Sequence, residues 1–87
     1  MTIEELVEQY IKNTRHVFQQ IKEGKDPQDK KAEKVLNYTK RYLEDAMYYS
    51  DKKRFETALA SVAYCEGLLD ALRLLGMVKF EWSMKRR

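Results

Sequence analysis

The residues best suited to chemistry are Glu66, Asp70 and Arg73, which share one side of a predicted C-terminal helix. Two acids four positions apart repel by about 0.2–0.5 kcal/mol, so helix stability alone does not explain Glu66 and Asp70. Gly67 between them costs about 1 kcal/mol relative to alanine and usually marks the close approach of another backbone or a ligand. Two carboxylates at this spacing can share a divalent cation.

This cluster has two interpretations. In the functional one, Asp45 and Tyr64 complete a small polar site, and the protein is an accessory domain that binds a small ligand or a metal ion. In the structural one, the same charges form an inter-helix salt-bridge network. Helical carboxylate sites commonly add Glu-x-x-His pairs from other helices, and the sequence has none. We therefore predict no metal site and no cofactor.

Other catalytic signals are missing. His16 is the single histidine and follows Arg15, so we expect it at the surface. The sequence contains no G-x-S-x-G elbow, no glycine-rich phosphate loop and no C-x-x-C pair. Cys65 is the single cysteine and lies in an apolar helical context, which predicts a core residue in a reducing compartment. We predict that the protein is not an enzyme and that it is cytoplasmic.

Three amphipathic segments must position these side chains, and we place helices at about 3–24, 27–50 and 52–75. Thr2 and Glu5 form a T-x-x-E capping box at the first start. Gly24 is expected to end that helix in a left-handed conformation. Asp26 and Pro27 are expected as N-cap and first residue of the second helix.

The boundary between the second and third helices is the least marked. The apolar heptad pattern on one face of the second helix does not continue past Tyr49. We therefore expect a turn at residues 50–54, with Ser50 or Asp51 as the next N-cap. On a helical wheel, the apolar stripe of the third helix then changes direction, because Phe55, Leu59 and Val62 point away from the stripe that follows. The later stripe consists of Cys65, Leu68, Leu69, Leu72 and Leu75.

Short connections favour an all-α fold, a three-helix antiparallel up-and-down bundle over residues 1–76 with a short basic, aromatic C-terminal tail over residues 77–87. In the tail, Val78, Phe80, Trp82 and Met84 alternate with polar residues. A single strand has no partner in a helical domain. The tail therefore lies back over the bundle, extends helically or adds to a partner.

Aromatic residues suggest a contact surface. Tyrosine is favoured at protein interfaces because it combines a large apolar ring with a polar group. We predict a noncatalytic helical interaction or scaffold module that self-associates as a homo-oligomer or docks to a protein partner. The candidate interface residues are Tyr38, Tyr48, Tyr49, Phe80 and Trp82.

Charge limits the other partners. The net charge is +3, but residues 1–78 are balanced and the excess lies in the tail. No contiguous basic face is present, so we predict no nucleic-acid partner. Lys85, Arg86 and Arg87 leave weak binding to an anionic surface as a third possibility. The first ten residues are acidic where a signal peptide is basic, and no apolar run reaches the ~20 residues of a membrane span.

The string YLEDAMYYSDKKRFETALASVAYCEGLLDALRLLG, which starts at Tyr42, resembles the archaeal domain-of-unknown-function family 357. Where that family often has a glycine in the second turn, this chain has Lys52-Lys53. The resemblance implies a three-helix bundle of archaeal type with no established activity. The matching elements are Asp45-Ala46, Tyr48-Tyr49, Phe55, Ala58-Leu59, Tyr64, the run from Gly67 to Leu72, and Gly76.

Overall fold

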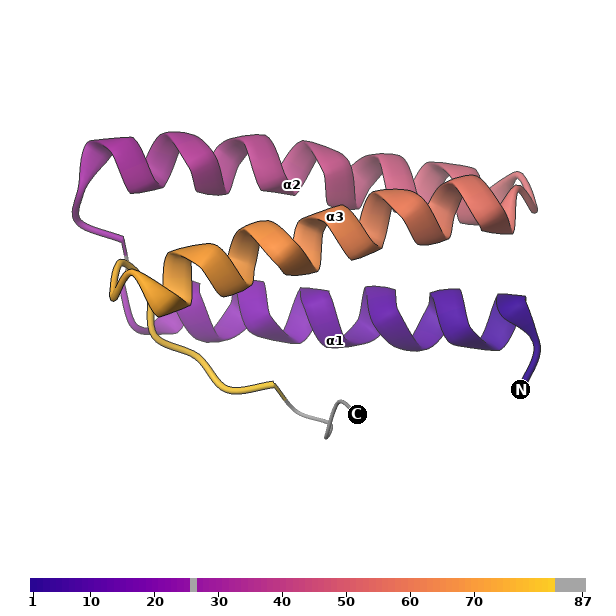
Figure 1. Cartoon of the computed structure of the whole chain (residues 1–87), viewed down its shortest axis with the longest axis horizontal. Helices are drawn as coiled ribbons and strands as arrows, with labels where there is room; N and C mark the ends of the chain where they lie inside the picture. Colours follow the sequence, from indigo (N-terminus) through magenta and orange to yellow (C-terminus); the bar gives the residue numbers. More distant parts are fainter. Residues whose placement is uncertain (26, 83–87) are drawn as a thin grey trace.

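The structure is a computed structural model that describes residues 1–25 and 27–82. Its three helices are α1 (Ile3–Glu23), α2 (Lys30–Asp51) and α3 (Phe55–Leu74). α1 and α3 run in the same direction and α2 runs in the opposite one (Figure 1). The predicted all-α three-helix bundle is confirmed. None of the helices that the structure describes has the length and apolar character needed to cross a membrane.

The N-termini of α1 and α2 are capped by side chains. In α1 the Thr2 hydroxyl accepts a hydrogen bond from the Glu5 amide at 3.1 Å, and the Glu5 carboxylate accepts one from the Thr2 amide at 2.8 Å. The predicted capping box is confirmed. α2 begins later than predicted, because the Asp29 carboxylate accepts from the amides of Lys31 and Ala32. Pro27 therefore precedes the helix, and Asp26 lies outside the described residues.

The two inter-helix turns use lysines in place of the expected residues. Gly24 keeps a right-handed conformation with φ −79°, and Lys25 adopts the left-handed one with φ 59°. The next turn likewise has Lys53 at φ 63°. A left-handed conformation is costly for a residue with a Cβ atom, so sequence preference favours glycine at both positions.

The predicted N-cap of the third helix is wrong. Ser50 and Asp51 are the last residues of α2, because the intrahelical hydrogen bonds continue through them. Arg54 occupies the N-cap position of α3 and makes no side-chain cap. At the other end, α3 stops at Leu74, and Gly76 adopts a left-handed conformation with φ 75° two residues beyond the helix.

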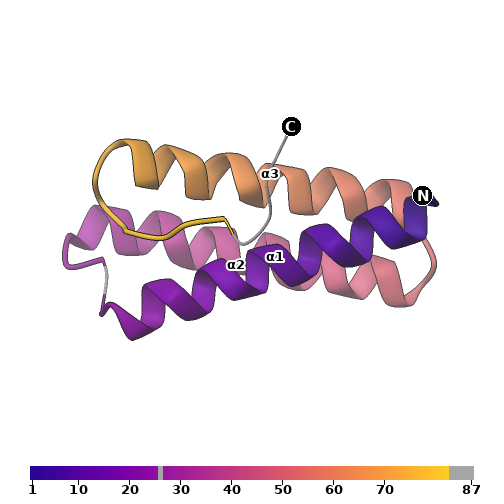
Figure 2. The same ribbon diagram turned by 90° about the horizontal axis from the view of Figure 1, so that it is seen from below.

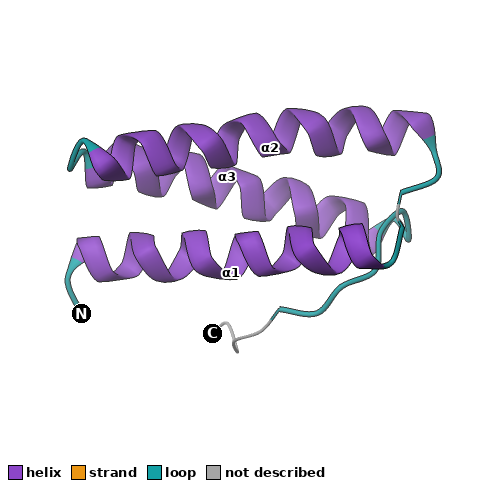
Figure 3. Ribbon diagram, turned by 180° about the vertical axis from the view of Figure 1, so that it is seen from behind, coloured by secondary structure: helices purple, strands orange, loops and turns teal. Residues whose placement is uncertain are grey.

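The core lies where α3 packs between α1 and α2, as the view from behind shows (Figure 3). The buried residues of α3 share one face: Ala58, Val62, Cys65, Glu66, Leu69 and Leu72. The predicted change of direction is therefore wrong, since Leu75 is 71% exposed and Phe55 is only half-buried. The apolar residues of α3 occupy more of its circumference than the core covers.

After α3, residues 77–82 form a C-terminal strap that runs back along the bundle beside α1 and α3 (Figure 2). Val78 and Phe80 are buried in the core cluster that contains Val17 and Leu72, whereas Lys79 and Glu81 are exposed. The alternation in the sequence therefore marks an extended segment that inserts every second side chain into the core. Within residues 1–25 and 27–82, no β-strand is formed.

Candidate functional site

The predicted acidic cluster on α3 holds the C-terminal strap. The Asp70 carboxylate accepts a hydrogen bond from the Trp82 indole at 2.9 Å and pairs with the Arg73 guanidinium at 3.3 Å. The same guanidinium lies 5.7 Å from the centre of the Phe80 ring. These three contacts explain why the charged residues Asp70 and Arg73 lie on the side of α3 that Val62 occupies nearer its N-terminus. They anchor the chain's own C-terminal segment.

The strap is also fixed to α1. The Gln20 side-chain amide donates to the Glu81 carbonyl at 2.7 Å, and the Gln20 side-chain oxygen accepts from the Glu81 amide at 3.0 Å. The rings of Phe80 and Trp82 meet edge to face with their centres 5.1 Å apart. Phe80 is only 8% exposed, so the prediction that it belongs to an exposed interface is wrong. Its aromatic surface is used inside the domain.

Glu66 is buried at 6% exposure and takes part in an interaction within the protein. Asp70 is half-buried and is engaged by both Trp82 and Arg73. The cluster therefore holds the chain's own C-terminal strap, and its Asp70–Arg73 ion pair lies within α3 and is not the inter-helix bridge that the structural interpretation predicted. Among the described residues, no group of three or more His, Cys, Asp or Glu side chains is placed to hold a metal ion.

Asp45 and Tyr64 do not join this cluster. Tyr64 and Arg73 are nine residues apart, so at 3.6 residues per turn they point in nearly opposite directions from the axis of α3. Tyr64 instead packs edge to face on Tyr42 of α2, with ring centres 4.7 Å apart. Asp45 acts on that side of the bundle, where its charge is one of the causes that raise the pKa of Tyr42.

Tyr38, Tyr42 and Tyr64 form a tyrosine cluster across α2 and α3. The Tyr38 and Tyr42 rings meet edge to face at 5.2 Å, and their hydroxyls are 3.3 Å apart. This hydrogen bond is the main cause that raises the pKa of Tyr42, while the charge of Tyr38 is the main cause that raises the pKa of Tyr64. Both phenols stay neutral at physiological pH, so they offer hydrogen bonds and apolar ring surface.

Tyr48 and Tyr49 lie in the last turn of α2, beside the connection to α3. Their rings pack edge to face at 5.3 Å. Lys52 lies 5.5 Å from the Tyr48 ring centre, and the Arg54 guanidinium lies 5.4 Å from that of Tyr49. Cation–π contacts of this kind stabilise a turn by about 0.5–1 kcal/mol at exposed sites. Tyr48 remains 56% exposed.

The sequence analysis missed the outward side of α3. Every exposed residue between Glu56 and Arg73 is uncharged, although 36% of the chain is charged. We call this surface the α3 outer face, and it consists of Ala60, Ala63, Tyr64, Gly67, Ala71 and Leu74. Leu74 is 77% exposed. The signal in the sequence was the absence of charge from residue 57 to 65, in a helix whose outward side is expected to be polar.

Gly67 lies at the middle of this face. The sequence suggested that it marks the close approach of another backbone or a ligand, but a Cβ atom placed there would have no other atom of the described chain within 4 Å. No other segment of the described chain therefore approaches Gly67 closely. Nothing in the described part of the chain requires a glycine at this point of α3.

A groove of about 800 Å³ lies between α1 and α2, and both acidic and basic side chains line it. Lys12, Arg15 and His16 face Met47 and Asp51 across it. His16 is exposed, as expected. Because acids and bases alternate along the groove, it has no single sign of charge that would select an anion or a cation.

Comparison with known proteins gives a family and no activity. No curated protein and no solved structure matches the chain. One family model, described as "Protein of unknown function (DUF357)", matches residues 5–78, which cover nearly all of α1, the whole of α2 and α3, and the first residues of the strap. The chain therefore belongs to domain-of-unknown-function family 357.

Proposed function

We propose that the protein is a noncatalytic helical interaction module that docks a protein partner on the α3 outer face. The carrying observation is the exposed, uncharged side of α3 in an otherwise heavily charged protein. Exposed residues of α1 and α2 are mostly charged, as in a solvated helix. Between Glu56 and Glu66, α3 carries no charged residue on any side, a composition more typical of a buried helix than of a solvated one.

The surface has the composition of a docking site. Tyr64 is 46% exposed and Tyr38 is exposed beside it on α2, so two tyrosines border the small residues of the α3 outer face. Tyrosine is enriched at interface centres, and small residues let a second helix approach closely. The alternative of a ligand or metal site at Asp70 receives no comparable support, because Asp70 already holds Trp82 and Arg73.

Site-directed photo-crosslinking tests this function. A photoreactive residue is introduced at Ala71 on the α3 outer face, and in a matched variant at Asn37, which is exposed on α2. We expect protein adducts at Ala71 under native conditions, from a second copy or from another protein, and none at Asn37. Equal adduct formation at both positions, or none at either, would contradict an interaction role for this face.

A further inference from the structure

The partner best suited to the α3 outer face is a second copy of the same chain. We infer that two copies pair through their α3 helices, antiparallel and related by a two-fold axis that passes beside Gly67. This inference rests on the proposed function and names the occupant of the same surface.

The geometry suits a helix pair. From Ala60 to Leu74 the face is about 21 Å long at 1.5 Å per residue, and Gly67 lies at its midpoint. Two-fold symmetry about Gly67 then places Ala63 of one copy level with Ala71 of the other, and Ala60 level with Leu74. Side chains this small permit interaxial distances near the short end of the usual range, about 8 Å. The open space around Gly67 would be filled by the second helix.

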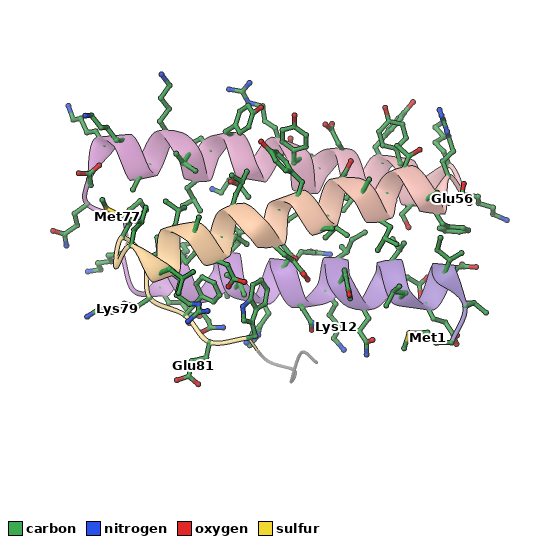
Figure 4. The ribbon with its side chains drawn as sticks, viewed as in Figure 1. Met1, Lys12, Glu56, Met77, Lys79 and Glu81 are labelled. Carbon is green, nitrogen blue, oxygen red and sulfur yellow. The ribbon has the colours of Figure 1, made fainter. Side chains whose placement is uncertain are left out.

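The charges at the two ends select the antiparallel direction. Glu56 is exposed at the beginning of α3, whereas Lys79 and Met77 lie at the opposite end of the molecule (Figure 4). An antiparallel pair brings Glu56 of each copy to the end where the other copy carries the exposed Lys79. A parallel pair would place Glu56 beside Glu56. Antiparallel packing also sets the two helix dipoles in the favourable orientation.

Symmetry closes the assembly. An isologous contact uses the same surface on both copies and ends at two, whereas a contact between the α3 outer face and the α1–α2 groove would continue into a filament. One helix face is a small interface, and small interfaces give weak or transient complexes. We therefore expect a dimer with a dissociation constant in the micromolar range.

Sedimentation equilibrium of the purified chain from micromolar to millimolar concentration tests the pairing. We expect a monomer–dimer equilibrium that Ala71→Glu weakens by at least about tenfold. Asn37→Glu introduces the same charge on exposed α2 and is expected to change nothing. Thermal melting by circular dichroism confirms that both variants fold. A wild-type monomer throughout, or a dimer that tolerates Ala71→Glu, would overturn the inference.

Two further variants test the orientation. Gly67→Cys is expected to form a symmetric disulfide under mild oxidation, while Asn37→Cys is not, and the native Cys65 is buried and does not react. Glu56→Lys is expected to weaken the dimer, and Lys79→Glu in the same chain is expected to restore it. If Ala71→Glu weakens the dimer but neither of these two results is observed, the antiparallel arrangement is overturned.

The two proposals fail differently. A chain that is monomeric alone and still forms adducts with another protein at Ala71 overturns the self-pairing and leaves the interaction function standing. A chain that is monomeric and forms no adducts overturns both.

Discussion

The strap gives the sharpest stability prediction, because Phe80 sits in the core although it follows the last helix by six residues. Phe80→Ala removes a ring that packs with Val17, Leu72 and Val78. Phenylalanine-to-alanine changes in cores cost about 3–5 kcal/mol. Phe80 lies at the edge of its cluster, at 8% exposure, so we expect the lower end, about 3 kcal/mol.

That loss is large for a chain of 87 residues. At about 0.05–0.15 kcal/mol per residue the whole domain is stable by roughly 4–13 kcal/mol. At about 4–8 °C per kcal/mol, the melting temperature should fall by about 12–24 °C. Urea unfolding followed by circular dichroism measures the change, and Lys79→Ala is the matched control. Lys79 is an exposed neighbour in the same strap, so its loss should stay within about 0.5 kcal/mol.

Trp82 fluorescence reports whether the strap leaves the bundle in the Phe80→Ala variant. Trp82 packs on Phe80 and donates to Asp70, so the native emission should shift to the red if the strap leaves the bundle. A red shift in Phe80→Ala with an unchanged unfolding midpoint would refute the reasoning. It would mean that the helices are stable without the strap and that Phe80 is not part of the cooperative core.

Five other variants test local features. Lys53→Gly is expected to stabilise the protein by about 0.5–1 kcal/mol, because it relieves a left-handed residue at φ 63°, whereas Lys52→Gly at φ −84° should destabilise it; thermal melting measures both. Thr14→Val is expected to stabilise by about 1 kcal/mol, because the buried Thr14 hydroxyl has no hydrogen-bond partner in the described part of the chain. Thr39→Val should instead be neutral or destabilising, since the Thr39 hydroxyl donates to the Val35 carbonyl at 2.8 Å. Burial raises the pKa of the Cys65 thiol to about 12 from 9.0, so the folded state keeps a proton that the unfolded state loses. The free energy of unfolding should therefore fall as pH rises from about 9 towards 12, and Cys65→Ala should reduce that fall in pH-dependent urea titrations.

Structural features that depend only on residues close together in the sequence were predicted correctly. The capping box of Thr2 and Glu5 needs only residues three apart, so the start of α1 was readable. The turns were not, because nothing local favours Lys25 or Lys53 in a left-handed conformation. The lengths and packing of the helices impose it on them.

The sequence predicted on which side of α3 the candidate site lies, but it did not predict what the site does. The wheel placed Asp70 and Arg73 on one side of α3, which the structure confirms. Their role depends on where residues 77–82 lie, and that is fixed by contacts such as Gln20 with Glu81, which are 61 positions apart. The α3 outer face was not predicted because its signal in the sequence is an absence of charged residues around Ala63.

The strap also determines when this domain can finish folding. Half of the core is built on α1 and α2, which leave the ribosome early, but Val78 and Phe80 belong to the same cluster as Val17. Local helix contacts form quickly, whereas contacts between distant positions must wait for the chain to close its largest loop. A nascent chain therefore exposes Val17 and Leu72 until the segment through Trp82 has been made. The three helices can assemble beforehand, and the domain reaches its full stability only when the strap closes over them.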